Sequence, residues 1–116
     1  MKGEHILKKL ISAALVFAAL ALFSWGSSAS AGEIEHGAQI FSANCAACHA
    51  GGGNVVNAAK TLRKDALEKY GMDSIEEIVY QVTHGKNAMP SFRGRLNEED
   101  LQDVAAYVLY KAEAGW

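Results

Sequence analysis

The only two cysteines of this 116-residue chain lie in one short motif that ends in a histidine. The motif reads Cys45-Ala46-Ala47-Cys48-His49. This C-x-x-C-H pattern is typical of covalent c-type haem attachment, in which each thiol adds to one vinyl group of the porphyrin. Three positions on a helix-like turn match the separation of the vinyl groups, and His49 then lies where its imidazole can bind the iron. The motif predicts one covalently bound haem c.

A C-x-x-C pair also occurs in redox disulfides and in zinc sites. A thioredoxin-like pair follows a strand within a long βαβ unit, a context that this sequence does not offer. A zinc site needs further pairs of Cys or His, and residues 32–116 lack them. Haem attachment therefore explains the pattern better than either alternative.

Met89 is the residue that we expect to fill the second axial position of the iron. It stands 40 residues after His49, and Pro90 biases it toward an extended conformation on a turn. A methionine is by default a filler of the core, but the other two methionines stand in less suitable contexts. A thioether opposite an imidazole stabilises ferrous iron and leaves no open site for a substrate. Ligation by His49 and Met89 thus predicts electron transfer, not catalysis.

The N-terminal segment has the order of a secretory signal peptide. Lys8 and Lys9 precede an apolar stretch from Leu10 to Phe23, and small residues then lead to Ala31. The alternative is an uncleaved membrane anchor, but 14 apolar residues fall short of the roughly 20 that a helix needs to cross a bilayer. We expect a signal peptide of the bacterial export type over residues 1–31, cleaved after Ala31, and a single cytochrome c domain over residues 32–116.

The domain that remains is small and acidic. It retains 8 Lys and Arg against 12 Asp and Glu, a formal charge near −4. Nucleic acid is an unsuitable partner because phosphate binding needs a cationic surface. The charge favours a monomer that stays in solution and is not anchored in a membrane. At about 85 residues an apolar core is marginal, so a large cofactor helps to hold the fold together.

Four segments have the apolar spacing of amphipathic helices. They run from Glu35 to about Asn44, from about Leu62 to Tyr70, from Ile75 to Gly85, and along a stripe from Leu101 to Ala112. Asp73 with Glu76 and Asn97 with Asp100 are capping-box patterns that mark two helix starts. Glycines at 51–53 form a loop in which backbone can wrap closely around a neighbour. No segment alternates with the period of a strand, so we expect an all-α fold of about four helices around one haem.

Three segments of the chain together resemble the cytochrome c6 family. They are GAQIFSANCAACHAGGGN at 37–54, GKNAMP at 85–90 and GW at 115–116, and the resemblance spans residues 32–116. It implies a small class I cytochrome c fold and an electron carrier between the cytochrome b6f complex and photosystem I. The implied location is the thylakoid lumen, with the periplasm as a second compartment.

The resemblance also implies roles for single residues. Gly37 and Phe41 would pack against the last helix at Val104 and Tyr107, with the glycine allowing a close crossing. Gln81 matches a glutamine that lies against the haem and tunes its potential, the alternative being an exposed helical side chain. Arg95 matches an arginine used for docking on photosystem I, although a lone exposed arginine is commonly only solvated.

The chain departs from the family pattern at three positions. His84 stands where asparagine is usual, Ser91 where alanine is usual, and Arg93 where glycine is common. Arg93 beside Arg95 would strengthen a positive patch at the docking surface. His84 is not expected to bind the iron, and His36 is expected to face solvent.

Two other functions stay open from the sequence. If Met89 did not bind the iron, an open site could serve a peroxidase or a gas sensor. A respiratory carrier that donates to a terminal cytochrome c oxidase would have the same residue chemistry as the photosynthetic one.

Overall fold

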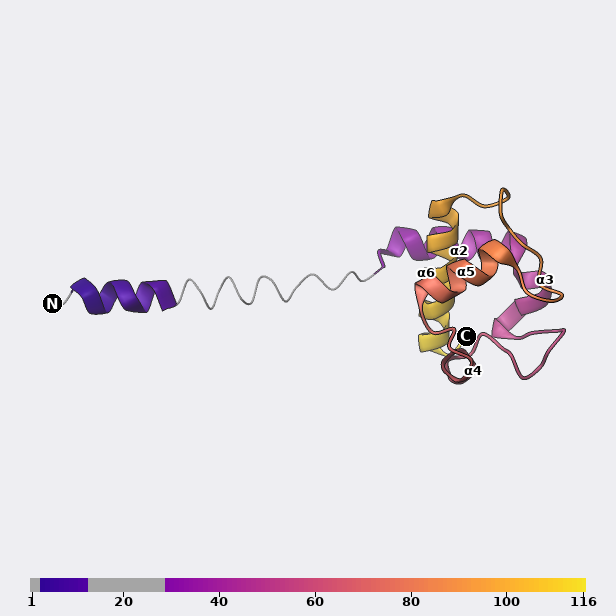
Figure 1. Cartoon of the computed structure of the whole chain (residues 1–116), viewed down its shortest axis with the longest axis horizontal. Coiled ribbons are helices and arrows are strands. Elements are labelled where there is room, and N and C mark those ends of the chain that lie inside the picture. Colours follow the sequence, from indigo (N-terminus) through magenta and orange to yellow (C-terminus); the bar gives the residue numbers. More distant parts are fainter. Residues whose placement is uncertain (1–2, 13–28) are drawn as a thin grey trace.

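A computed structural model describes residues 3–12 and 29–116 of the chain, and these residues are mainly helical. In chain order the elements are α2 (Ala31–Asn44), α3 (Ala46–His49), the 3-10 helix η1 (Ala50–Gly52), α4 (Lys64–Lys69), α5 (Ile75–His84) and α6 (Glu98–Ala114) (Figure 1). Residues 3–12 also form a helix. The described residues contain no named strand, only two isolated bridges, Lys86–Met89 and Arg93–Leu96. The all-α prediction is confirmed.

Helix α2 begins earlier than the expected start at Glu35. Ser30 is its N-cap, and the Ser30 hydroxyl accepts a hydrogen bond from the backbone N–H of Glu33. The Glu33 carboxylate in turn accepts from the backbone N–H of Ser30, 2.6 Å away. This reciprocal capping box satisfies two N–H groups of the first turn and fixes Ala31 as the first helical residue. The expected start at Glu35 is therefore wrong, because the capping pattern of Ser30 and Glu33 lies before it.

The two predicted capping boxes have different outcomes. Asn97 and Asp100 form theirs at the start of α6, with side chain to backbone bonds in both directions. Asp73 is not the cap of α5. The cap is Ser74, one residue later, whose hydroxyl accepts from the backbone N–H of Glu77. The shift by one residue arises because both positions offer a capping oxygen, and the pattern alone does not rank them.

The core lies where α2 crosses α6 and α5 packs beside them (Figure 1). Gly37 permits the close crossing. A Cβ at this position would collide with the backbone oxygen of Asp103 and would lie 2.8 Å from the Cβ of Tyr107. The expected contact of Gly37 with α6 is therefore confirmed. The buried apolar cluster comprises Ile40, Phe41, Leu67, Ile78, Val82, Phe92, Leu101, Val104, Ala105, Val108 and Ala112.

Aromatic side chains join α2, α6 and the C-terminus. The ring of Phe41 lies 5.3 Å from the rings of both Tyr107 and Trp116, measured between centroids. The indole of Trp116 covers Gly52, where an added Cβ would meet the ring at 2.5 Å. Its Nε1 donates to the backbone oxygen of Leu62 at 2.8 Å. The predicted glycine loop thus does wrap closely around a neighbour, and that neighbour is Trp116.

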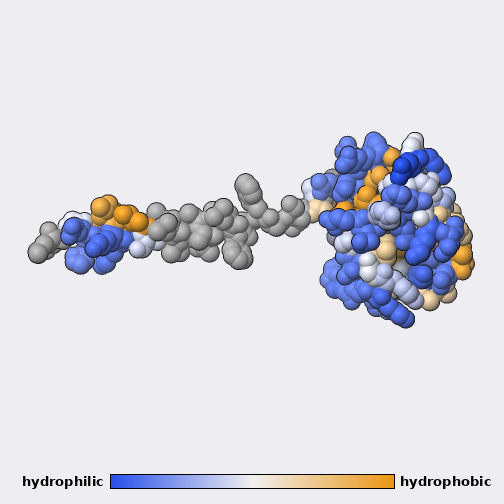
Figure 2. Space-filling model, viewed as in Figure 1, coloured by the Kyte–Doolittle hydropathy of each residue, from blue (hydrophilic) through white to orange (hydrophobic). Residues whose placement is uncertain are grey.

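The surface of the region from 29 to 116 is largely hydrophilic on the face shown in Figure 2, with apolar side chains visible in small areas. None of the helices in the described residues is long and apolar enough to span a membrane. Most of the apolar stretch of the predicted signal peptide lies in residues 13–28, outside the described residues. The signal peptide and its cleavage after Ala31 stay predictions.

Candidate haem site

The C-x-x-C-H motif forms one short helical turn directly after α2. Cys45 closes α2, with its backbone N–H bonded to the oxygen of Phe41 at 2.8 Å. The N–H groups of Cys48 and His49 then both donate to the oxygen of Cys45, at 3.2 and 2.9 Å. The packed end of α2 therefore fixes the position of the motif.

Neither cysteine of the motif is in a disulfide. Cys45 is partly buried, and burial raises the pKa of its thiol to about 11, whereas reactive redox cysteines have lowered pKa values. Cys48 is exposed. Among the described residues the one His, Cys and carboxylate cluster with metal-ligand spacing does not include either cysteine. These observations disfavour the redox-disulfide and zinc-site alternatives.

His49 is held in the orientation of a metal ligand. Its Nδ1 lies 2.8 Å from the backbone oxygen of Gly53. A carbonyl can only accept, so Nδ1 carries a hydrogen, and in the neutral imidazole the lone pair is then on Nε2. Metal-binding histidines commonly donate their second N–H in this way, which fixes the tautomer and the ring orientation. The glycine loop thus supplies the carbonyl that orients the His49 ring.

Met89 lies on a tight turn between α5 and α6. Its backbone N–H and oxygen both pair with Lys86, at 2.9 and 3.0 Å. Gly85 makes the turn possible because its φ is +72° and an added Cβ would lie 2.7 Å from the oxygen of Met89. The side chain of Met89 is half-buried against the core, and its sulfur accepts a hydrogen bond from the side-chain amide of Gln81. The turn predicted around Met89 is therefore present.

The two arginines after Met89 are both exposed but differently held. The guanidinium of Arg95 lies 4.9 Å from the ring centroid of Phe92, a cation–π contact. Arg93 donates from Nη2 to Nε2 of His84 at 3.0 Å. His84 lies 2.8 Å from the oxygen of Tyr80 through its Nδ1 and stacks on the Tyr80 ring. Two of the departures from the family pattern, His84 and Arg93, are thus partners, and Arg93 is less free than a lone surface cation.

The structure shows two features that the sequence predictions missed, one beside the haem motif and one at the crossing of α2 and α6. Val55 and Val56 are 75% and 67% exposed, and the backbone N–H of Val55 donates to the oxygen of Cys48. They place apolar surface beside the motif, and two adjacent valines in a polar loop are the signal that could have revealed them. The second feature is the partner of His36. The His36 side chain is 42% exposed, in line with the expectation that it faces solvent, but its Nδ1 also lies 2.6 Å from Oδ2 of Asp103 on α6.

A haem fits the chemistry of the residues that are predicted to hold it. The donor set is an oriented imidazole, a half-buried thioether and two free thiols. An imidazole nitrogen and a thioether sulfur are the axial ligands of low-spin haem iron in electron carriers, and a pair of thiols in this motif attaches to the haem vinyl groups. The helical fold and this motif together define the class of the molecule, a small c-type cytochrome.

Comparison with known proteins specifies the family. Residues 32–108 match the family model described as cytochrome c oxidase, cbb3-type, subunit III. Cytochrome c6 of Nostoc sp. is 59% identical over 95% of this chain and 99% of its own length. Cytochrome c6 of Parathermosynechococcus lividus is 64% identical over 72% of this chain and 97% of its own. The crystal structure of cytochrome c6 from the diatom Phaeodactylum tricornutum covers 72% of this chain and 98% of that one, with a TM-score of 0.70 and 59% identity.

The chain belongs to the cytochrome c6 family. It is a haem protein that carries electrons, and it is not an enzyme. An electron carrier has redox partners, so this chain has at least one donor and one acceptor.

Proposed function

We propose that Cys45 and Cys48 hold one haem c through two thioether bonds, with His49 and Met89 as its axial ligands. The observation that carries this proposal is the orientation of His49, whose Nδ1 is bonded to Gly53 so that Nε2 is left as the donor atom. Each thiol adds across one vinyl double bond. The sulfur bonds to one vinyl carbon and the hydrogen goes to the other, so no oxidant or reductant is consumed.

Mass spectrometry tests the attachment directly. The acid-denatured protein should weigh one haem more than its polypeptide, because thioether bonds survive acid. Cys45→Ala with Cys48→Ala should release the haem into acidic organic solvent. Haem that extracts from the unaltered protein would disprove covalent attachment.

The bound haem iron supplies a one-electron couple, and the residues around it keep that couple free of other chemistry. With both His49 and Met89 as ligands, the iron would have no open site of the kind that a peroxidase or gas sensor needs. Gln81 donates to the Met89 sulfur, which supports the tuning role implied by the family. A one-electron couple without substrate chemistry at the iron suits an electron carrier.

We infer that the electrons pass from the cytochrome b6f complex to photosystem I in the thylakoid lumen, carried by a monomer. The close relationship to cytochrome c6 supports this route. Val55 and Val56 offer an apolar contact surface beside the motif, and Arg95 with Arg93 offers positive charge near the Met89 turn. Apolar contact with charge at its rim is the pattern that gives fast and short-lived association.

A respiratory carrier that donates to a terminal oxidase is the second candidate. The family model that matches residues 32–108 is described as a subunit of a cbb3-type cytochrome c oxidase, and this description supports the respiratory candidate. Flash-induced reduction of photosystem I by the purified protein separates the two candidates. Fast reduction that saturates with protein concentration supports the photosynthetic route, and no reduction at any concentration contradicts it.

Residues 1–31 are proposed to be a signal peptide that directs export and is then removed. The family model begins to match at residue 32, and the relative from P. lividus aligns over nearly its whole length with only 72% of this chain. N-terminal sequencing of the protein recovered from the exported fraction tests this proposal. It should read Gly-Glu-Ile-Glu-His, and a sequence that starts near Met1 would contradict it.

A further inference from the structure

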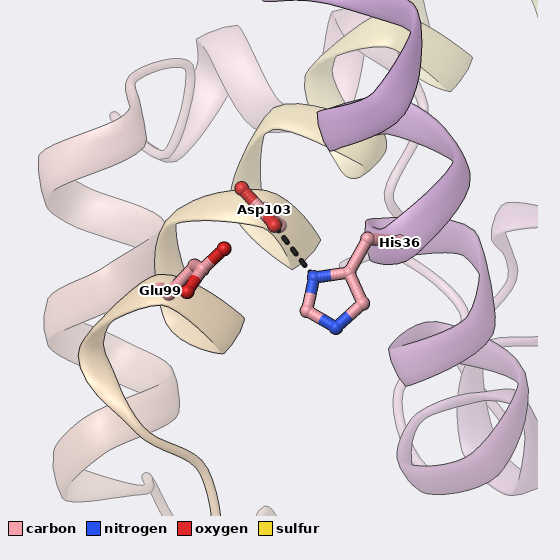
Figure 3. A group of neighbouring side chains, drawn as sticks. All are labelled: His36, Glu99 and Asp103. Carbon is pink, nitrogen blue, oxygen red and sulfur yellow. Dashed lines mark hydrogen bonds and ion pairs between the residues drawn. The ribbon is translucent and has the colours of Figure 1, made fainter.

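His36, Glu99 and Asp103 converge where α2 crosses α6, away from the haem motif in sequence (Figure 3). Glu99 and Asp103 are four residues apart on α6, so both side chains lie on the same face of that helix. His36 comes from α2, and the close crossing at Gly37 brings it to them. One ligand atom from each of the three residues lies within 4.8 Å of the others.

We propose that His36, Glu99 and Asp103 bind a divalent transition metal ion, with Zn²⁺ as the best match. Zinc takes imidazole nitrogen and carboxylate oxygen together, and three protein ligands leave a fourth position for water. The imidazole favours zinc over magnesium or calcium, which prefer sites made only of oxygen.

Burial and charge distinguish this cluster from an ordinary group of surface acids. Asp103 is the only charged residue that is buried among the described residues, with 7% of its surface exposed. His36 faces three carboxylates, from Asp103, Asp100 and Glu99. One imidazole among three carboxylates leaves an excess of negative charge, which a divalent cation neutralises better than a proton does.

Asp100 places a carboxylate near the second nitrogen of the His36 ring, as is common for histidines that bind a metal. Nδ1 of His36 faces Asp103 at 2.6 Å, and Nε2 lies 3.6 Å from Oδ1 of Asp100. A metal on Nδ1 would therefore leave Nε2–H directed at a carboxylate that orients the ring. A bound metal would replace the proton between His36 and Asp103 and would join α2 to α6.

Isothermal titration calorimetry of the haem-loaded protein with ZnCl₂ tests the proposal. The loaded form is used because Cys45, Cys48 and His49 are occupied there and cannot compete for zinc. One saturable site is expected per chain. Glu99→Gln removes an exposed ligand without disturbing the core and should weaken zinc binding by more than about tenfold, while Asp100→Asn should weaken it by about tenfold.

His84→Gln is the matched control, because it removes an exposed histidine outside the cluster and should leave the affinity unchanged. His36→Gln should abolish the site, and MgCl₂ should give no saturable binding. The proposal is overturned if the unaltered protein shows no saturable zinc binding, if Glu99→Gln and His36→Gln bind as tightly as the unaltered protein, or if His84→Gln loses the site.

Discussion

Gln81 donates a hydrogen bond from its side-chain amide to the sulfur of Met89, with 3.6 Å between Nε2 and Sδ. The two residues come from the last turn of α5 and from the loop that follows it. A sulfur atom is a weak acceptor, but this contact lies on the proposed iron ligand itself. Through this hydrogen bond, the position of α5 affects the electron density on the Met89 sulfur.

Gln81→Val should lower the reduction potential. The amide N–H draws electron density from the sulfur and favours the ferrous state, so its loss favours the ferric state. A hydrogen bond contributes about 1 kcal/mol, and 59 mV corresponds to about 1.4 kcal/mol for one electron, so the expected fall is on the order of 50 mV. Redox titration measures it. Gln102→Val, an exposed change on α6, is the control that should leave the potential in place.

Gly37→Ala should destabilise the fold by about 1–3 kcal/mol, the usual cost of forcing extra volume into a packed contact. The new methyl group would collide with the backbone oxygen of Asp103, which cannot move without α6. Urea unfolding followed by circular dichroism measures the loss. Gly53→Ala is the comparison, because its Cβ would meet one atom at 3.4 Å, an ordinary contact. Equal stability of the two variants would show that α2 and α6 can accommodate a methyl group at their crossing.

Stability should depend on the charge of His36. Its hydrogen bond to Asp103 raises its pKa above the ordinary value of 6.5, and the nearby carboxylates act in the same direction. A raised pKa in the folded state means that the stabilisation is fully present below pH 6.5 and is lost as the pH rises through the folded value. With a metal chelator present, the stability difference between the unaltered protein and His36→Gln should therefore shrink from pH 6 to pH 9. A stability difference that stays constant over this range would show that the charge of His36 does not contribute to stability.

Arg95→Glu should slow the reduction of photosystem I several-fold at low ionic strength and much less at high salt. Charges at the rim of a contact surface act mainly on the association rate, and salt screens them over about 8 Å at physiological ionic strength. Arg93→Glu should have a smaller effect because Arg93 is already engaged by His84. Arg63→Glu makes the same charge change at the start of α4 and is the control. Equal rates for Arg95→Glu and Arg63→Glu would exclude Arg95 from docking.

Much of the candidate site could be predicted from the sequence because its signals are local. Cys45, Cys48 and His49 occupy one turn, and the proline and glycine around Met89 mark a bend within a few residues. The cap of α6 is equally local, since Asn97 and Asp100 are three residues apart. Local patterns of this kind depend on backbone geometry that neighbouring residues set by themselves.

Contacts between distant segments could not be predicted in the same way. His36 and Asp103 are 67 residues apart and meet because α2 and α6 cross at Gly37. His84 and Arg93 each depart from the family pattern, but only the fold shows that they bond to one another. The sequence supplies the residue types, whereas such pairs depend on how the helices pack.

The absorption spectrum of the oxidised protein at long wavelength shows most directly whether His49 and Met89 close both axial positions of the haem iron. We expect a six-coordinate low-spin spectrum with a methionine-to-iron charge-transfer band. Met89→Ala should keep the covalent haem, lose the band, lower the potential and bind added cyanide or carbon monoxide, while Met72→Leu should keep the band. A high-spin spectrum of the unaltered protein, or a band that survives Met89→Ala, would exclude Met89 as an iron ligand.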